Sequence, residues 1–574
     1  MTKGGKTALV IVGVLVGALV VVAFIVRRSQ QPAQGSVLEL TLRGDIPDYV
    51  PVSGLSQILG EPKLTMRDYV EALRLARDDQ RIKGVLVAID GPEVGSGRLQ
   101  ELRDALTDFQ SGGKWAAAYL ETAGEFSPGN RDYYLATACG RIWLGPSGDI
   151  NLTGIRAEVP FVRGTLEKLD IVPDFDHIGK YKNAMNTITD KVMNEPHREA
   201  MDALVSAVFG QIKRGIAAGR KITEAEVEAL IDGGPYVGPR ALEAKLVDAL
   251  GYRDEMEKTL KEENGGELPL FKVGKYLKAG RFYTSGPKVA LIYGLGGVSR
   301  GENDSNPMTG EMSMGSATTA AAIKEAREDD SIKAIVFRVD SPGGSYVASD
   351  IIWREVTLTK GKKPIVVSMG DVAGSGGYFV AMAADKIVAQ PGTITASIGV
   401  LAGKLVTKDF WEMVGLTSDY IQRGRHATFY SSDQQFTPEE RAIFKGWLER
   451  IYKDFVGKVA QGRGKTFDEI HAIAQGRIWS GEDALKLGLV DELGGLPTAV
   501  ARAAELAHLD PKGKVQLVEV PAQKSFLQEI FSRDDSTDST SLERLRIQVR
   551  DFVEEGRLPI RDEVLAMPYV PRVR

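Results

Sequence analysis

Two stretches of this sequence, ARDDQRIKGVLVAID at 76–90 and AREDDSIKAIVFRVD at 326–340, decide the fold because the second repeats the first. In each, a charged helix end runs into apolar residues that predict a buried strand. Further matches follow in the same order along the chain: YYLATACGRIWLGPSGDINLTG at 133–154 with YFVAMAADKIVAQPGTITASIG at 378–399, and YVGPRALEAKLVDALG at 236–251 with IWSGEDALKLGLVDELGG at 478–495. We conclude that the chain contains two copies of one unit.

Short β-branched runs alternate with helical stretches in both copies. VLVAI at 85–89 has the composition of a strand, and TTAAAIKEAREDD at 318–330 has that of a helix. This alternation predicts βαβ units, and hence an α/β fold with a largely parallel sheet. The predicted domains are a first repeat at 36–275, a second repeat at 286–510 and a C-terminal extension at 511–574, with the join in the Gly- and charge-rich stretch from about 262 to 287.

The composition is that of a globular protein, and it excludes several classes. With 43% hydrophobic and 26% charged residues among 574, the chain has enough apolar content for more than one core. Lys and Arg number 72 against 77 acids, so the net charge of −5 gives no basic excess of the kind that nucleic acid binding requires. Cys139 is the only cysteine, which excludes an intrachain disulfide and a Cys-rich zinc site. We expect no cofactor, no metal and no nucleic acid partner.

The N-terminus has the pattern of a membrane anchor. Residues 7–26, TALVIVGVLVGALVVVAFIV, carry no charge over the length that a helix needs to cross a membrane. A cleaved secretory signal is the alternative, but its apolar region would be shorter and followed by a small-residue cleavage site, whereas two arginines follow here. We therefore expect a transmembrane anchor at 1–31. Lys3, Lys6 and the amino terminus favour a cytoplasmic N-terminus, which would leave the body of the protein outside the cytoplasm.

Two small-residue turns in the second copy carry the predicted chemistry. RVDSPGGS at 338–345 and GDVAGSGGYF at 370–379 each place a glycine-rich turn directly after an apolar strand, where backbone could approach a substrate. Ser375 lies in the second turn, before a helix, so its hydroxyl could act as a nucleophile while the N–H groups of Gly344 and Gly376 form an oxyanion hole. The alternative is that both are only tight strand-to-helix turns.

The first copy differs at both turns. RVDSPGGS becomes AIDGPEVG at 88–95, and the position equivalent to Ser375 is Asn130. The first copy therefore lacks both the nucleophile and the glycine pair.

A serine nucleophile needs a base, and the candidates are histidines and lysines. HIGKYKNAMN at 177–186 in the first copy carries Lys180 and Lys182, whereas the matching QRGRHATFYS at 422–431 has no lysine. The two copies are thus predicted to divide one active site, with the lysine in the first and Ser375 in the second. The five histidines lack the setting of a Ser–His–Asp triad. They are His177, His197, His426, His471 and His508. His426 is the one that lies beside the position in the second copy equivalent to the lysine.

A lysine base must lose its charge near neutral pH. A free lysine has a pKa of ~10.4, so burial has to lower that pKa by roughly three units or more. A site assembled between two domains could exclude enough water to do so.

Taken together, these motifs resemble signal peptide peptidase A, also called protease IV, in its long tandem form. The resemblance covers about 36–510 and rests on SPGG at 341–344, GSGGY at 374–378, TITASIGV at 393–400, GKYKNA at 179–184 and ALKLGLVDELGG at 484–495.

The resemblance implies that Ser375 is the nucleophile, Lys182 the general base and Ser397 a serine that holds the lysine. It implies domains of the Clp protease and crotonase kind, and substrates that are signal peptides left in the membrane after cleavage. It also implies homo-oligomers, tetrameric in the long form. We expect a single-pass protein of the bacterial cytoplasmic membrane, with extracytoplasmic or periplasmic catalytic domains.

Two other functions stay open. A crotonase-like acyl-CoA enzyme would share the glycine-pair turn, but it predicts acidic catalytic residues near the oxyanion hole, where this chain has Ser375. A non-catalytic membrane scaffold would tolerate the loss of Ser375 or Lys182, and both are present.

Overall fold

The structure is a computed structural model and describes residues 31–51, 63–280, 286–305, 311–511, 513–522 and 565–566. The predicted membrane span at 7–26 and most of the predicted extension at 511–574 lie outside these residues. Within the part of the chain that is described, no helix combines the length and the apolar character that a membrane crossing requires.

The first copy folds around a parallel sheet. Its strands are β1 (Ser36–Asp45), β2 (Ile82–Glu93), β3 (Trp115–Leu120), β4 (Arg141–Leu144), β8 (Ala249–Leu250) and β9 (Leu270–Lys272). They lie in the order β8-β4-β3-β2-β1-β9, and all neighbours pair parallel. The central run of β2 is buried on both faces of the sheet, which is why its sequence is almost continuously apolar.

The second copy repeats this sheet. Its strands are β10 (Lys288–Leu295), β14 (Ile332–Ser341), β16 (Ile365–Gly374), β17 (Lys386–Ala389), β18 (Ile394–Ala396), β20 (Ile478–Ser480), β21 (Glu492–Leu493) and β22 (Gln516–Glu519). The path runs β20-β18-β16-β14-β10-β22, with β17 joining β16 to β21, and only the pair β18 and β20 is antiparallel. The α/β prediction with a largely parallel sheet is confirmed in both copies.

Short strands form additional small sheets. One runs in the order β12-β13-β11-β15-β23 and contains β11 (Gly297–Ser299), β12 (Asp304–Ser305), β13 (Met312–Gly315), β15 (Gly343–Gly344) and β23 (Leu565–Ala566). Two antiparallel pairs consist of β5 (Asp149–Ile150) with β7 (Tyr236–Val237), and of β6 (Val172–Ile178) with β19 (Val400–Val406).

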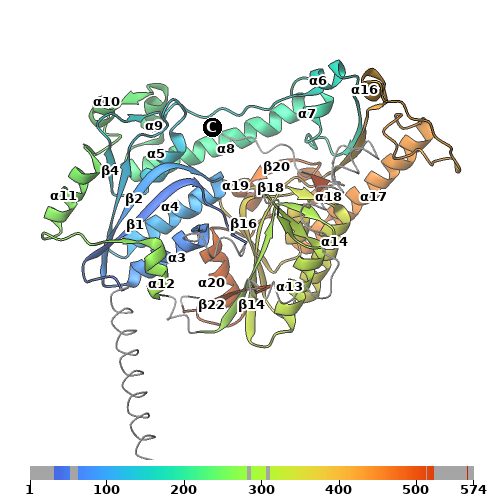
Figure 1. Cartoon of the computed structure of the whole chain (residues 1–574). Coiled ribbons are helices and arrows are strands. Elements are labelled where there is room, and N and C mark those ends of the chain that lie inside the picture. Colours follow the sequence, from blue (N-terminus) through green and yellow to red (C-terminus); the bar gives the residue numbers. More distant parts are fainter. Residues whose placement is uncertain are drawn as a thin grey trace, which may run out of the picture.

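Helices surround both sheets (Figure 1). Those of the first copy are α3 (Met66–Asp78), α4 (Ser96–Ser111), α5 (Asn130–Ala136), α6 (Arg163–Lys168), α7 (Asn186–Thr189), α8 (Glu195–Arg220), α9 (Glu224–Asp232), α10 (Gly238–Glu243), α11 (Arg253–Glu263) and α12 (Val273–Gly280). Those of the second copy are α13 (Ser316–Glu328), α14 (Tyr346–Thr359), α15 (Gly376–Ala381), α16 (Lys408–Met413), α17 (Pro438–Arg463), α18 (Phe467–Ile473), α19 (Gly481–Lys486) and α20 (Leu496–Leu506). Each copy buries its own apolar cluster between helices and sheet.

The structure extends the second repeat beyond its predicted end at residue 510. Strand β22 pairs with β10 at the edge of the second sheet, and Val520 packs into the second core. The predicted join at about 262 to 287 likewise contains β9, which pairs with β1, and α12. These strands are only three and four residues long, so their sequences carry too little periodicity to reveal them.

The two copies interlock rather than lie side by side as separate domains. β6 of the first copy pairs along its whole length with β19 of the second. The long helix α8 runs from the first copy toward the second, along the top of Figure 1, and contacts β20. The first copy therefore reaches into the second with the segment that carries the candidate lysine.

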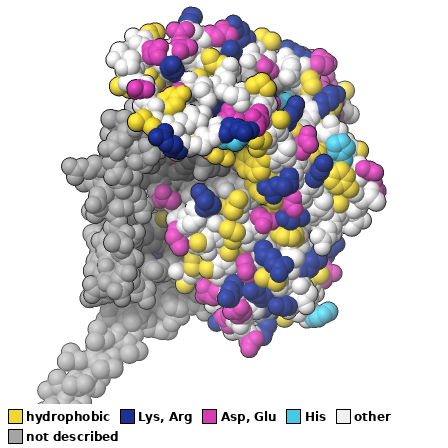
Figure 2. Space-filling view, turned by 90° about the vertical axis from the view of Figure 1, so that its right-hand side faces the viewer, with side chains coloured by type: hydrophobic (Ala, Val, Ile, Leu, Met, Phe, Trp, Pro, Cys, Tyr) yellow, Lys and Arg dark blue, Asp and Glu magenta, His cyan; other side chains and the backbone are white. Residues whose placement is uncertain are grey.

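The surface on the right-hand side of Figure 1 carries charges of both signs. On the face shown in Figure 2, acidic and basic side chains are interspersed with apolar ones. No broad field of one sign covers the described residues of this face, in agreement with the small net charge of the chain.

Candidate active site

Ser375 is the single residue between β16 and α15. Its φ of 53° and ψ of −113° place a residue with a Cβ in a strained backbone region. The Ser375 N–H donates to the Ala396 carbonyl at 2.7 Å, and its own carbonyl accepts the Phe379 N–H at 2.9 Å. A sharp strand-to-helix turn of this kind presents a serine hydroxyl at the end of a sheet.

Lys182 comes from the first copy, just after β6, and is held by the second copy. The neighbouring Tyr181 N–H donates to the Gln475 carbonyl at 2.7 Å. Gly476 lies so close that a Cβ on it would sit 2.5 Å from the Lys182 backbone nitrogen. Strand pairing and this close approach together carry the lysine into the second copy, where it is fully buried.

Three oxygens surround Lys182 Nζ. Ser375 Oγ lies at 2.8 Å, and the carbonyl oxygen and Oγ of Ser397 each lie at 3.0 Å. A neutral amine has two N–H groups and one lone pair. When the two N–H groups donate to the Ser397 oxygens, the lone pair faces the Ser375 hydroxyl. The geometry therefore suits transfer of the Ser375 proton to the lysine.

The electrostatic setting of Lys182 favours the neutral amine. Burial lowers the pKa of Lys182 to about 7, because the ammonium form would lose its water. Close to neutral pH, a large fraction of the lysine is therefore unprotonated and able to accept a proton.

Ser397 is positioned by a second strained turn. Ala396 and Ser397 have φ values of 66° and 51°, so two successive non-glycine residues are left-handed. The Ser397 N–H donates to the Arg477 carbonyl at 3.0 Å, which fixes this turn. As a result, both the backbone and the side-chain oxygen of Ser397 point at the lysine.

Gly344 and Gly376 lie against each other beside the Ser375 turn. A Cβ on Gly376 would sit 3.0 Å from the Gly344 nitrogen, and one on Gly344 would sit 2.2 Å from the Val298 carbonyl oxygen. Gly376 is the first residue of α15, and an N–H at that position has no acceptor within its own helix. The structure thus brings both predicted oxyanion donors close to Ser375, the candidate nucleophile.

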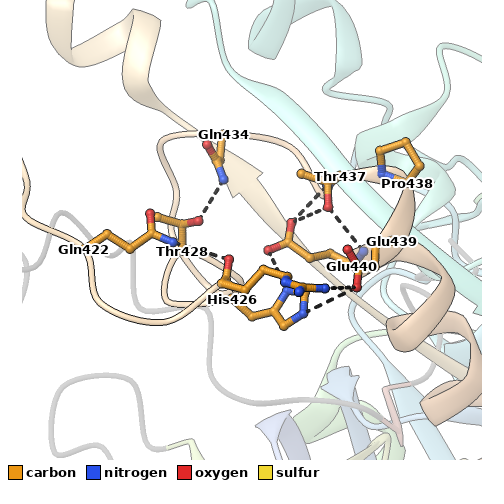
Figure 3. Close-up of a pocket in the computed structure, with 9 residues that line it drawn as sticks. Gln422, His426, Thr428, Gln434, Thr437, Pro438, Glu439 and Glu440 are labelled. Carbon is orange, nitrogen blue, oxygen red and sulfur yellow. Dashed lines mark hydrogen bonds and ion pairs between the residues drawn. The ribbon is translucent and has the colours of Figure 1, made fainter.

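Lys180 and His426 do not join this cluster. The Lys180 side chain is 56% exposed and its Nζ lies 4.0 Å from Glu199. His426 lines a cavity of about 550 Å³ at the start of α17, where its Nδ1 is 3.6 Å from Glu440 and its Nε2 is 3.9 Å from Glu439 (Figure 3). The lining of this cavity includes neither the candidate nucleophile nor the buried lysine.

Asp371 is a residue near the site that sequence analysis missed. It lies on β16, which ends just before Ser375, and its carboxylate accepts the N–H groups of Gly95 at 2.7 Å and Arg98 at 2.8 Å at the start of α4. Burial acts to raise its pKa, but the Arg98 guanidinium and these N–H groups hold that pKa below its ordinary value. Asp371 therefore caps a helix of the first copy from a strand of the second. No local pattern reveals this, because both partners lie in the other repeat.

A second buried ion cluster joins the copies close by. Arg338 of β14 is 1% exposed, and its guanidinium lies 2.8 Å from Glu101 and 3.1 Å from Asp48, both in the first copy. Each charge has partners of opposite sign, as burial requires. The strands that end at the two candidate turns are thus tied to the first copy.

The cluster as a whole has the parts that acyl transfer requires: a hydroxyl, a neutral amine within hydrogen-bond distance and backbone donors beside them. Among the described residues, no group of three His, Cys, Asp or Glu side chains could hold a metal ion.

Comparison with known proteins gives consistent matches. The family model described as "Peptidase family S49" matches residues 125–266 and 357–510. The chain is 34% identical over 517 residues to "Serine protease SPPA, chloroplastic" of Arabidopsis thaliana, covering 88% of this chain and 74% of that protein. It is 33% identical over 511 residues to "Protease 4" of Salmonella typhi, covering 84% and 80%.

Two further similarities are partial. The "Putative signal peptide peptidase SppA" of Enterococcus faecium is 32% identical over 173 residues, which cover 30% of this chain and 50% of that protein. Among solved structures, a ClpP1 mutant from Listeria monocytogenes aligns with 35% of this chain and 90% of its own at 16% identity, with a TM-score of 0.22. That score is too low to support an argument, so the Clp protease and crotonase likeness of the domains stays a prediction.

Proposed function

The chain belongs to peptidase family S49 and is a serine protease, and from that premise we propose that Ser375 is its nucleophile and Lys182 its general base. The contact of 2.8 Å between Lys182 Nζ and Ser375 Oγ carries the proposal. Each copy of the repeat supplies one member of this dyad, so neither copy is active alone.

The reaction follows from the geometry. As Ser375 Oγ attacks the peptide carbonyl, neutral Lys182 takes its proton while Ser397 holds the amine in place. The N–H groups of Gly344 and Gly376 stabilise the negative charge that develops on the carbonyl oxygen. The lysine ammonium then protonates the leaving amine. Water hydrolyses the acyl-enzyme in the second half, with Lys182 again accepting a proton.

We propose that the substrate binds as an extended strand along β15. Both residues of this strand, Gly343 and Gly344, lack side chains, so a peptide backbone can approach closely. β15 pairs with β11 through Gly344 and Val298, and a substrate strand would pair along the opposite edge, which in this structure contacts the two residues of β23. Recognition through main-chain hydrogen bonds would accept many sequences and suits an endopeptidase.

We further propose that the substrates are apolar peptides in or near a membrane, including signal peptides after their cleavage. The uncharged run at 7–26 supports an anchor, with the catalytic copies on the extracytoplasmic side. The name of the Enterococcus faecium relative, a putative signal peptide peptidase, supports the substrate class.

A homo-oligomer, tetrameric as the resemblance implies, is part of the same proposal. Exposed apolar side chains gather around the end of α16, and an uncovered apolar surface of this kind favours association. They are Met413, Val414, Leu416, Tyr420 and Ile421.

Covalent labelling tests the nucleophile. A fluorophosphonate that phosphonylates activated serines should add one label to the native chain, and peptide mapping should find it on Ser375. The Ser375→Ala variant should stay unlabelled and fail to hydrolyse apolar peptide esters, although its folding is unchanged. The labelling rate should rise with pH around a midpoint of about 7, as Lys182 loses its proton. Label on another serine, or turnover of acyl-CoA thioesters without peptide hydrolysis, would contradict the proposal.

A further inference from the structure

Strands β14 and β16, which lead into the two glycine-rich turns of the site, do not pair regularly to their ends. The register is regular as far as Val339, which lies opposite Met369. Pairing resumes with Ser341, which lies opposite Ala373. Asp340 alone therefore faces a run of three residues in β16. A β-bulge of this kind changes the direction of the chain that follows it.

The side chain of Asp340 fills this bulge. Its Oδ1 accepts the Val372 N–H at 2.9 Å and so takes the place of a main-chain acceptor in the sheet. Gly370 makes room for the carboxylate, because a Cβ at that position would sit 2.9 Å from both Cβ and Cγ of Asp340. The Asp340 carbonyl accepts the Gly296 N–H at 2.9 Å, which ties the same residue to the chain after β10.

We propose that Asp340 is a positioning residue of the oxyanion hole: its carboxylate holds the bulge of β16 and thereby sets where Gly344 lies relative to Ser375. The inference rests on the proposed function, because it takes the N–H groups of Gly344 and Gly376 as the donors to the reacting carbonyl oxygen. Asp340 acts through the backbone and takes no part in proton transfer.

The bulge determines how the two turns are aligned. Ser341 comes three positions before Gly344, and Ala373 comes two positions before Ser375. Between the regular pairs, β16 contains two residues more than β14. Two residues of extended strand span roughly 7 Å, which is more than twice the roughly 3 Å over which an oxyanion donor acts. Loss of the bulge would therefore separate the nucleophile from the glycine pair.

The two turns are in contact at the spacing that the bulge provides. Ser341 Oγ accepts the Gly343 N–H at 3.2 Å within the first turn. A Cβ on Gly377 of the second turn would sit 2.5 Å from the Ser341 carbonyl oxygen. With so little space between them, a shift of either strand end would move one oxyanion donor relative to the other.

The equivalent aspartate of the first copy does not have this role. Asp90 aligns with Asp340, but its side chain is 59% exposed, against 19% for Asp340, and it forms an ion pair with Arg43 at 3.1 Å. The pairs between β2 and β3 keep one register from Gly84 to Ile89. The filled bulge thus belongs to the copy that carries Ser375, and it is not a general requirement of the repeat.

The Val372 N–H requires an acceptor oxygen at this position rather than a charge. Arg98 Nε lies 3.8 Å from Asp340 Oδ2 and is closer to Asp371. Burial and the neighbouring Asp371 carboxylate raise the pKa of Asp340 above its ordinary value, so ionisation of this carboxyl is disfavoured. An amide oxygen in the same place should therefore serve as the acceptor.

The test compares three substitutions in the full-length chain. Asp340→Ala removes the acceptor, Asp340→Asn keeps an acceptor oxygen, and Asp90→Ala removes the equivalent carboxylate of the first copy. Complete labelling of Ser375 with the fluorophosphonate counts the folded sites, so that kcat is expressed per site. The measurements are kcat and KM for a short apolar peptide ester, and the inhibition constant of the matching peptide aldehyde. The hemiacetal that this aldehyde forms with Ser375 places its oxygen in the oxyanion hole.

We expect Asp340→Ala to lower kcat per site roughly tenfold or more and to weaken aldehyde inhibition by a similar factor, with KM little changed. Asp340→Asn should recover most of the native kcat, and Asp90→Ala should behave like the native chain. A role in folding alone would reduce the number of labelled sites but leave kcat per site and aldehyde inhibition native, and that result would overturn the inference. Equal losses in Asp340→Ala and Asp340→Asn would refute the acceptor role.

Gly370→Ala tests the same contact from the other strand. Its Cβ would meet the Asp340 side chain at 2.9 Å and displace the carboxylate from the Val372 N–H. The variant should reproduce both losses, and it replaces Asp340→Ala if that chain does not fold. Native constants in folded Gly370→Ala would contradict the inference and leave the proposed function intact. A native chain that neither takes label at Ser375 nor hydrolyses the ester would instead refute the proposed function, and this inference with it.

Discussion

The two copies of the repeat use the same strand-to-helix turn for different purposes. In the first copy, the turn after β2 leads into α4, whose first N–H groups at Gly95 and Arg98 are capped by Asp371 of the other copy. In the second copy, the turn after β14 contains the glycine pair, and Ser345 caps its own helix α14 through its hydroxyl. The turn of the first copy joins the two copies, and the turn of the second copy lies beside Ser375.

The next turn along each sheet differs in the same way. In the first copy, Asn130 occupies the position equivalent to Ser375, and its side chain accepts the N–H groups of Thr153 and Gly154 at 3.1 Å and donates to the Gly154 carbonyl at 2.7 Å. In the second copy, the Ser375 hydroxyl contacts Lys182 instead. A side chain that satisfies its own backbone stabilises the fold, whereas one that faces a buried base is available for chemistry.

Loss of Lys182 should have the largest effect on activity of all the changes that compare the two copies. Lys182→Ala should lower kcat/KM for peptide esters by roughly three powers of ten, because Ser375 would lose its proposed general base. Lys180→Ala is the matched control two positions away, and it should keep native activity since that side chain is exposed. Native activity in Lys182→Ala would show that the copies do not share one site in this way.

Removal of the cap between the copies comes next. Asp371→Asn leaves the Arg98 guanidinium, which is 17% exposed, without its closest counter-charge, and should lower the free energy of unfolding by roughly 3 kcal/mol. It should also lower kcat, because β16 leads directly into Ser375, the proposed nucleophile. Chemical denaturation and ester hydrolysis measure the two effects. Asp45→Asn, which breaks an exposed ion pair with Lys63, is the control and should cost at most about 1 kcal/mol. If Asp371→Asn and Asp45→Asn lowered the free energy of unfolding equally, the contact between the two copies would not depend on the buried carboxylate of Asp371.

The lysine should also make stability depend on pH. The pKa of Lys182 is about 7 in the folded chain against an ordinary 10.5, so between these values the unfolded chain binds a proton that the folded chain does not. Stability should therefore rise with pH across this window, by up to about 1.4 kcal/mol per pH unit from this group.

Comparison of Lys182→Met with the native chain isolates this contribution. In the variant, the free energy of unfolding should rise less steeply with pH, because the lysine contribution is missing. The variant should be more stable than the native chain near pH 7, and this difference in the free energy of unfolding should shrink toward pH 10.5. Urea denaturation at several pH values measures it, with Lys180→Met as the exposed control. Parallel slopes in all three proteins would show that the buried lysine keeps its proton.

The smallest effect is expected in the first copy. Asn130→Ala removes the bonds to Thr153 and Gly154 and should lower the free energy of unfolding by about 1–3 kcal/mol. The folded fraction should keep native kcat, which thermal denaturation and active-site titration can establish together. A large loss of kcat would indicate that the first copy has a direct part in the chemistry beyond its lysine.

Local sequence was sufficient to predict much of this arrangement. The alternation of apolar runs and helices predicted both α/β units, because burial between helices and sheet imposes that pattern on each strand. The glycine-rich turns singled out Ser375, Gly344 and Gly376, because a turn that admits backbone or substrate excludes side chains. These signals lie within a few residues of the groups they identify.

Contacts between distant parts of the chain were not predictable in the same way. The cap from Asp371 to α4 and the pairing of β15 with β23 join residues from distant parts of the chain. Short strands such as β22 were also not predicted from the sequence, since a run of a few residues shows no hydrophobic periodicity. In each case the partner, rather than the segment itself, determines the structure.

The sequence by itself determined the repeat, the α/β class and a short list of candidates that included two lysines in one loop. The family resemblance pointed to Lys182, and the tertiary structure showed how its surroundings differ from those of Lys180. The pairing of β6 with β19 buries the first completely and leaves the second in water. Burial lowers the pKa of an amine because the ammonium loses its hydration, and hydration depends on what surrounds a side chain in space rather than on its neighbours along the chain.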